Sequence, residues 1–237
     1  KLTIATGQPA YEPWVMNDKP ESGEGYEAAV AYAVADKLGF KKSDVVWTRT
    51  AFDTAIAPGA KDWDFNIQQF GITDERKKAV DFSSSYYNDS QSVVVKKDSK
   101  FANATKVSDL KDATVGVMVG TLAYDYAKAN IKDDIQTFND DAALAQALDA
   151  GQIDALVTST VECVYMVQSE QVKDAKVLGR LPDSEDKSGM GIVLPKDSKL
   201  TAAVTKAVDD LNADGTIKKL QDKWLAEYTT DLTELKK

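Results

Sequence analysis

The chain has 237 residues, of which 43% are hydrophobic, with a formal net charge of −9 and no histidine. This length allows one large domain or two modest ones with a hydrophobic core, and the mixed charge is typical of a folded globule rather than a disordered chain. The negative charge disfavours nucleic acid and anionic membranes as partners. No apolar run approaches the ~20 residues that span a bilayer.

The lack of histidine removes the commonest general base and the commonest metal ligand. Cys163 is the single cysteine, so an internal disulfide, a Cys–His nucleophile pair and a multi-cysteine zinc site are all excluded. The glycine pairs at 23/25 and 189/191 lack the lysine and the helix of a phosphate-binding loop. We therefore expect no metal, no cofactor and no catalytic residue, and a binding function.

The first third of the chain alternates predicted strands and helices. Residues 2–5 and 45–48 are strand-like, and a helix with one apolar face runs from residue 26 to a stop at Gly39. Phe52 opens a short helix. This order predicts parallel strands with helical crossovers, whose ligands lie beyond the carboxyl ends of the strands. Tyr11 and Trp14 lie in the loop after the first strand, where an aromatic side chain either fills the core or lines a pocket.

Residues 64–76 combine a short strand, a loop and the first turn of a helix. Residues 64–67 form the strand, Gly71 interrupts the pattern, and Thr73 is a good N-cap for a helix that runs to residue 79. Asp74 and Glu75 suit the positive end of that helix. Arg76 then has two interpretations: it pairs with these acids on the surface, or it joins the backbone N–H groups of the preceding loop to bind a carboxylate.

From residue 91 the pattern restarts. Strands are predicted at 91–97, 113–119, 135–138 and 153–157, with helices at 105–111, 123–130, 140–150 and from 160 onward. Residues 187–194 form a returning strand, and two amphipathic helices follow from residues 200 and 216. The repetition predicts two α/β lobes joined by two hinge strands.

The residues around Arg76 resemble the signature of a known family. The loop Gln68-Gln69-Phe70-Gly71, then Ile72-Thr73, two residues, Arg76, and then Val80-Asp81-Phe82-Ser83 and Tyr86-Tyr87, is similar to the extracytoplasmic solute receptors of ABC importers for polar amino acids. The resemblance covers nearly the whole chain, including Gly120-Thr121 after a Val-Gly-Val strand. It implies an α/β, two-lobed fold of the periplasmic-binding-protein type II, with lobe 1 at residues 1–91 and 187–237 and lobe 2 at 92–186.

The resemblance also implies roles for single residues. In the family, the positions of Gln68, Gln69, Gly71 and Arg76 hold the α-carboxylate of the ligand, and Gly120 and Thr121 add backbone and hydroxyl contacts. Aromatic positions matching Tyr11 and Phe52 form pocket walls. The full expected ligand-binding set is Tyr11, Trp14, Phe52, Gln68, Gln69, Phe70, Gly71, Arg76, Met118, Gly120, Thr121, Leu122 and Ser159.

Three positions depart from the family pattern. Ser159 stands where relatives carry the Asp that receives the α-ammonium group, and Gly71 stands where they carry Ser or Thr. Leu122 is apolar where many carry a hydroxyl. Glu162, one helical turn beyond Ser159, either replaces the missing carboxylate or caps its own helix. Carboxylate recognition is therefore expected to be retained, whereas ammonium recognition is altered.

These features predict the solute receptor of an ABC importer. We expect it to bind a small carboxylate-bearing ligand, an amino acid or a similar compound, in an inter-lobe cleft that closes about the hinge. The resemblance implies a monomer that works with membrane permease subunits, in the periplasm or at the cell surface, with its leader removed and with lipid anchoring as one mode of attachment. Two alternatives stay open: a lyase or dehydratase that uses Glu12 or Glu162 as its acid, and an extracellular ligand-sensing domain.

Overall fold

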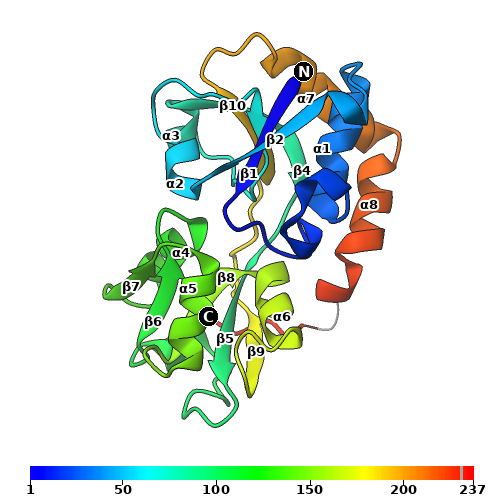
Figure 1. Cartoon of the computed structure of the whole chain (residues 1–237). Coiled ribbons are helices and arrows are strands. Elements are labelled where there is room, and N and C mark those ends of the chain that lie inside the picture. Colours follow the sequence, from blue (N-terminus) through cyan, green and yellow to red (C-terminus); the bar gives the residue numbers. More distant parts are fainter. Residues whose placement is uncertain (230–231) are drawn as a thin grey trace. The chain divides into compact units, whose positions relative to one another are not determined.

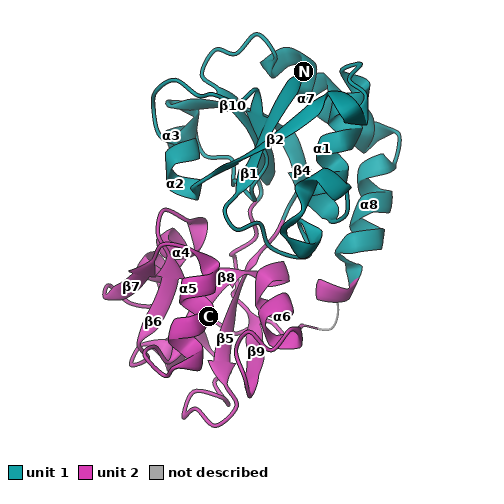
Figure 2. Cartoon of the chain, in the orientation of Figure 1, with its two compact units in different colours: residues 1–88, 187–226 teal, residues 89–186, 227–237 magenta. Residues whose placement is uncertain are grey.

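The computed structural model describes residues 1–229 and 232–237 and divides the chain into two compact units (Figure 1, Figure 2). Unit 1 comprises residues 1–88 and 187–226, and unit 2 comprises residues 89–186 and 227–237. Each unit is built on a five-stranded sheet of its own. Among the described residues, no helix is both long and apolar enough to cross a membrane.

The sheet of unit 1 has the strand order β2-β1-β3-β10-β4. Strand β1 pairs in parallel with β2 and β3, whereas β10 runs antiparallel to β3 and β4. The carboxyl ends of the three parallel strands therefore share one edge, as the alternation of strands and helices predicts. The strands of this sheet are β1 (Leu2–Gly7), β2 (Val45–Thr50), β3 (Phe65–Asn66), β4 (Val80–Tyr87) and β10 (Met190–Pro195).

Two groups of helices flank this sheet. Helices α1 (Tyr26–Lys37), α7 (Thr201–Ala213) and α8 (Thr216–Trp224) contact one another, and α7 packs on β4. Figure 1 shows the short helices α2 (Phe52–Ala55) and α3 (Asp74–Lys77) on the other side of the unit. Three 3-10 turns complete unit 1: η1 (Met16–Asp18), η2 (Pro20–Ser22) and η3 (Lys42–Asp44).

The sheet of unit 2 has the order β7-β6-β8-β5-β9. Strand β6 is parallel to β7 and β8, and β5 is antiparallel to β8 and β9. The strands are β5 (Gln91–Lys96), β6 (Val115–Met118), β7 (Ile135–Phe138), β8 (Ala155–Ser159) and β9 (Ala175–Arg180). The helices are α4 (Leu122–Asn130), α5 (Asp141–Asp149), α6 (Thr160–Gln168) and the 3-10 turn η4 (Val107–Leu110), with η5 (Ala226–Tyr228) at the boundary between the units.

Strand β5 explains why the sequence of unit 2 contains a run of three valines. Val93 and Val95 join the core that contains Ala123 of α4, whereas Val94 joins the core that contains Leu144 of α5. Alternate side chains of a strand point to opposite faces. A central strand covered on both faces must therefore be apolar throughout.

Residues 227–237 belong to unit 2, whereas the sequence analysis placed them in lobe 1. Leu235 is 3% exposed in the core of unit 2, and its N–H donates to the carbonyl of Arg180 at 2.9 Å. Lys236 exchanges main-chain hydrogen bonds with Thr105 and Val107. Such a short, irregular segment has no periodicity, so the sequence pattern could not assign it. Residues 89–91 likewise fall in unit 2 rather than in lobe 1.

Candidate functional site

Polar side chains gather where β1, β2 and β3 end. The hydroxyl of Thr6 donates to the carbonyl of Ile67 at 3.0 Å, and Asn66 Nδ2 donates to Thr50 Oγ1 at 2.8 Å. Thr50 Oγ1 in turn donates to Gln68 Oε1 at 3.3 Å. These bonds fix Gln68, half-buried, at the carboxyl edge of the sheet, where the sequence predicts it.

The loop between β3 and α3 is tied to strand β10. Gly71 forms an antiparallel bridge with Met190, and the N–H of Ile72 donates to the carbonyl of Gly189 at 2.9 Å. Gln69 has φ 53°, in the left-handed region that residues with a Cβ rarely adopt. The loop therefore has one defined backbone conformation that its neighbours must stabilise.

Helix α3 places Arg76 against this loop. Thr73 caps the helix, because its hydroxyl oxygen accepts the N–H of Arg76 at 3.1 Å. The guanidinium Nη1 donates to the carbonyl of Gly71 at 2.7 Å, and the guanidinium carbon lies 5.5 Å from the centre of the Phe52 ring. Both the predicted cap and the predicted position of Arg76 beside the loop are present.

The acids of the first turn have lysine partners. Asp74 lies 3.9 Å from the ammonium group of Lys77, and Glu75 lies 2.8 Å from that of Lys78. All four of these side chains are exposed, whereas Arg76 is half-buried. The geometry thus favours the interpretation in which Arg76 serves the loop over the one in which it pairs with its own helix.

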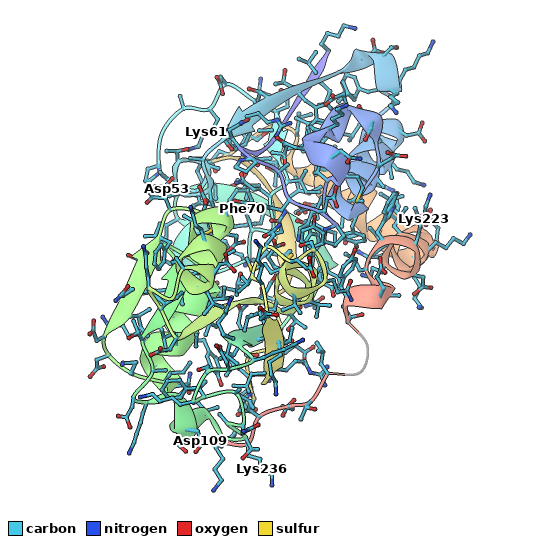
Figure 3. The ribbon with its side chains drawn as sticks, turned by 60° about the horizontal axis from the view of Figure 1, so that its bottom comes forward. Asp53, Lys61, Phe70, Asp109, Lys223 and Lys236 are labelled. Atoms are coloured by element: carbon cyan, nitrogen blue, oxygen red, sulfur yellow. The ribbon has the colours of Figure 1, made fainter. Side chains whose placement is uncertain are left out.

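Two of the expected pocket aromatics lie in the core instead. Trp14 and Phe70 are both 0% exposed. The Phe70 ring (labelled in Figure 3) packs on Phe52 with 4.7 Å between centroids and belongs to a buried core cluster of unit 1, and Trp14 packs edge-on against Tyr26 at 6.0 Å. Their large apolar surfaces are already covered by protein, so we remove both from the ligand-binding set. Phe52 stays half-buried.

Arg49 joins the two ends of residues 7–18, the segment that carries Tyr11. Arg49 binds the carboxylate of Asp18 and donates to the carbonyl of Gly7 at 2.9 Å. Burial acts to raise the pKa of Asp18, but the hydrogen bonds from Arg49 and from the N–H of Ala10 lower it below its ordinary value. Tyr11 is half-buried within this closed segment.

A buried carboxylate that the sequence reasoning missed lies behind the loop. Glu27 is 0% exposed, and its carboxylate accepts hydrogen bonds from the backbone N–H of Gln69 at 2.8 Å, from Gln69 Nε2 and from the hydroxyl of Tyr86. Burial raises the pKa of Glu27 to about 7, although these hydrogen bonds act in the opposite direction. Glu27 lies four residues before the buried Ala31 and seven before the buried Val34, and this spacing places all three on the inner face of α1. That spacing is the signal in the sequence that could have revealed Glu27.

In unit 2, four expected ligand residues lie around the start of α4. Met118 is 8% exposed at the end of β6, Gly120 is exposed with φ 74°, and Leu122 is half-buried. The hydroxyl of Thr121 donates to the carbonyl of Met118 at 2.7 Å and accepts the N–H of Tyr124 at 3.3 Å. A hydroxyl has one proton, so the expected donation to a ligand carboxylate is not supported. Thr121 caps the helix instead.

The side chain of Ser159 contacts a buried carboxylate from another part of the chain. Ser159 Oγ accepts the N–H of Glu162 at 3.4 Å, so that it caps α6, and its side chain hydrogen-bonds the carboxylate of Asp89. Asp89 is 6% exposed and also accepts the N–H of Ser90 at 2.8 Å. Burial raises its pKa to about 7. A carboxylate thus stands directly behind Ser159, although no spacing in the sequence indicates it.

Of the two acids considered for catalysis, one accepts a structural hydrogen bond and the other is buried. Glu12 accepts the backbone N–H of Asn17 at 2.9 Å, and Glu162 is 2% exposed in the first turn of α6. Among residues 1–229 and 232–237, no group of three or more His, Cys, Asp or Glu side chains is placed to hold a metal ion.

Two α/β units, each interrupted in the sequence and each with its own mixed sheet, define a two-lobed α/β binding protein. Residues 2–227 match the model of the bacterial extracellular solute-binding proteins, family 3, and the chain belongs to this family. The predicted fold class and family are thereby confirmed.

Individual relatives agree with this assignment. The chain is 29% identical to the L-arginine-binding protein of Pseudomonas aeruginosa, covering 92% of this chain and 85% of the relative. It is 30% identical to the L-cystine-binding protein TcyJ of Escherichia coli, covering 93% and 81%. The structure of an ancestral arginine-binding protein bound to arginine superposes with a TM-score of 0.79 at 31% identity, covering 95% of this chain and 98% of the other.

Proposed function

We propose that this protein is the amino-acid receptor of an ABC importer and that Arg76 binds the α-carboxylate of its ligand. The observation that carries the proposal is the position of the Arg76 guanidinium, 2.7 Å from the carbonyl of Gly71 and over the face of Phe52. A planar guanidinium that is held in place and partly shielded from water is the preferred partner of a carboxylate.

We propose further ligand-contact residues in each unit, considered by itself. Gln68, Gln69, Gly71, Tyr11 and Phe52 supply polar groups and walls in unit 1. In unit 2, Met118, Gly120, Thr121, Leu122 and Ser159 stay in the proposed set, with Thr121 and Leu122 offering the N–H groups of a helix start. Asp89 stabilises a cationic group at Ser159, because a buried carboxylate is the ordinary partner of an ammonium group.

The relatives bind arginine and cystine, which makes these two the first probes. A thermal-shift screen of the twenty amino acids, cystine, betaines and small organic acids tests the proposal. A ligand present at 100 times its Kd adds about 2.7 kcal/mol to the free energy of unfolding, so a true ligand raises the Tm by several degrees. If no amino acid shifts the Tm and an organic acid does, the proposed ligand class is wrong.

We propose that the protein has no enzymatic activity. Glu12 accepts a hydrogen bond from the backbone of Asn17, and Glu162 is buried. Both observations support this proposal, because a general acid must reach the reacting atom. An NMR time course of the bound ligand tests the point. An unchanged spectrum agrees with a receptor, and the appearance of product identifies a lyase or dehydratase.

We also propose that it acts as a monomer outside the cytoplasm and delivers its ligand to membrane permease subunits. Membership of a family of extracellular solute-binding proteins supports the location and the partner. Light scattering tests the monomer, and ligand-dependent stimulation of the reconstituted transporter's ATPase tests the partner.

A further inference from the structure

The buried Glu27 carboxylate is the feature of unit 1 that the ligand contacts leave unexplained. We propose that Glu27 is a positioning residue, which holds the loop Gln68–Gly71 in its ligand-binding conformation by binding Gln69 through both the backbone and the side chain. This inference rests on the proposed function, because it assigns the loop to the ligand's carboxylate.

Two hydrogen bonds join Glu27 to the same loop residue. Gln69 N–H donates to Glu27 Oε2 at 2.8 Å, and Gln69 Nε2 donates to Oε1. The Tyr86 hydroxyl, on β4, also donates to Oε2. Three donors therefore converge on two oxygens of one carboxylate, and this arrangement orients the group as well as satisfying it.

The backbone of the loop needs such an anchor. Gln69 has φ 53°, a conformation that is strained for a residue with a Cβ. Without a partner that binds both its N–H and its side-chain amide, Gln69 would relax toward ordinary backbone angles. The N–H groups and carbonyls of Phe70 and Gly71, including the carbonyl that accepts from Arg76, would move with it.

Glu27 is itself fixed by the start of α1. Its N–H donates to the carbonyl of Trp14 at 2.9 Å, and the N–H of Tyr26 donates to that of Pro13 at 2.9 Å. This docking needs glycine at position 25, where φ is 104° and an added Cβ would lie 2.5 Å from the Trp14 carbonyl oxygen. The first turn of α1 thus connects two segments with candidate ligand residues: the segment of Tyr11 through its backbone and the loop through the Glu27 carboxylate.

The first test needs no ligand. Amide hydrogen exchange of Gln69, measured by NMR in the protein alone at about pH 7.5, above the raised pKa of Glu27, should be at least about tenfold faster in Glu27→Gln than in the parent, since one of the two terminal atoms of a glutamine side chain is a donor and cannot accept a hydrogen bond. The N–H of Ile67, which donates to the Ala5 carbonyl at 3.0 Å, is the internal reference. A general loss of stability would accelerate both amides equally.

The second test measures affinity by calorimetry, with the amino acid that gives the largest Tm rise in the screen. Glu27→Gln should weaken binding by about tenfold or more, the fold-change of one lost hydrogen bond to a charged group. Val30→Ala is the matched control: Val30 is buried on the same helix, so the change lowers stability while the Glu27 carboxylate is retained, and the affinity should stay within twofold. If Glu27→Gln does not fold, Glu27→Asp keeps the charge, gives up one Gln69 contact, and should show a smaller change in both readouts.

The outcomes separate this proposal from the proposed function. Faster exchange at Gln69 relative to Ile67, together with the affinity loss, supports the positioning role. Exchange at Gln69 within twofold of the parent overturns it, and so does an affinity within twofold when Arg76→Ala has raised the Kd about 100-fold or more. If no amino acid binds the parent, the proposed function fails, and the exchange experiment still decides whether Glu27 holds the loop.

Discussion

Replacing Arg76 with alanine is the sharpest perturbation of the candidate site. The change removes a half-buried guanidinium that contacts the Gly71 carbonyl at 2.7 Å and the Phe52 ring at 5.5 Å. It leaves the cap at Thr73 intact, because that cap uses the backbone N–H of residue 76. The helix and the loop should therefore persist while the charge is lost.

The expected loss of affinity is large. Two opposite unit charges 4 Å apart attract by about 4 kcal/mol at the effective dielectric constant of a partly shielded site. Truncating one partner of a buried charge pair costs about 2–5 kcal/mol. The structure places Arg76 between exposed and buried, so we expect about a 100- to 1,000-fold rise in Kd, near the middle of that range. Folding stability should fall by only about 1 kcal/mol, the size of one cation–π contact.

Calorimetry of the parent and variant with the same amino acid measures the effect. Lys78→Ala is the matched control, because it removes one positive charge from the end of α3, where Lys78 is exposed and pairs with Glu75. Its Kd should stay within twofold. Arg76→Lys keeps the charge but cannot bind a carboxylate in a bidentate way, so its Kd should lie between those of Lys78→Ala and Arg76→Ala. A Kd for Arg76→Ala within threefold of the parent would refute the carboxylate assignment.

Three further predictions concern stability and the neighbouring charges. Because the pKa of Glu27 is raised from 4.5 to about 7, the native state holds a proton that the unfolded chain releases. This group lowers the free energy of unfolding by about 3 kcal/mol as pH rises through the window, in addition to the fall that Asp89 causes. In urea unfolding at pH 5 and 8, the difference between the two pH values should be smaller in Glu27→Gln than in the parent by about this amount. Ser159→Asp places a second carboxylate beside Asp89 and should lower the free energy of unfolding by about 2 kcal/mol more at pH 8 than at pH 5. The control Ser159→Asn should lose the same amount at both pH values. Equal losses at both pH values for Ser159→Asp would contradict the contact between residue 159 and Asp89. Leu235→Ala should lower the free energy of unfolding, measured with a denaturant, by about 2–4 kcal/mol, because the side chain is buried. The exposed-residue control Lys237→Ala should lower it by less than about 0.5 kcal/mol. Similar values for the two variants would contradict a structural role for the C-terminal segment.

The sequence predicts those features of the site that depend on local rules. The Thr73 cap depends on residues three positions apart, and the turn of the chain after β3 is indicated by Gly71. The place of Gln68 and Phe52 after strands follows from the order of elements. Each of these inferences uses only residues that are close together in the sequence, or the regular spacing of apolar residues in one element.

The missed features depend on contacts across the sequence. Glu27 and Gln69 are separated by 42 residues and Asp89 and Val161 by 72, and no periodicity connects such pairs. Phe70 illustrates a second limit: an aromatic residue in a loop is equally suited to a pocket wall or to the core, and only its packing on Phe52 decides. Thr121 illustrates a third, since a helix cap and a ligand donor use the same hydroxyl.

The return of the C-terminal residues to unit 2 has a consequence for how the chain folds during synthesis. All residues of unit 1 have been synthesised once residue 226 is added, but unit 2 still lacks Leu235 and the main-chain partners of Arg180 and Thr105. Domains generally fold as units while the ribosome adds about 5–20 residues per second. The unit that lies in the middle of the sequence is therefore the last to be completed, and the end of β9 lacks its main-chain partners until residues 233–235 are added.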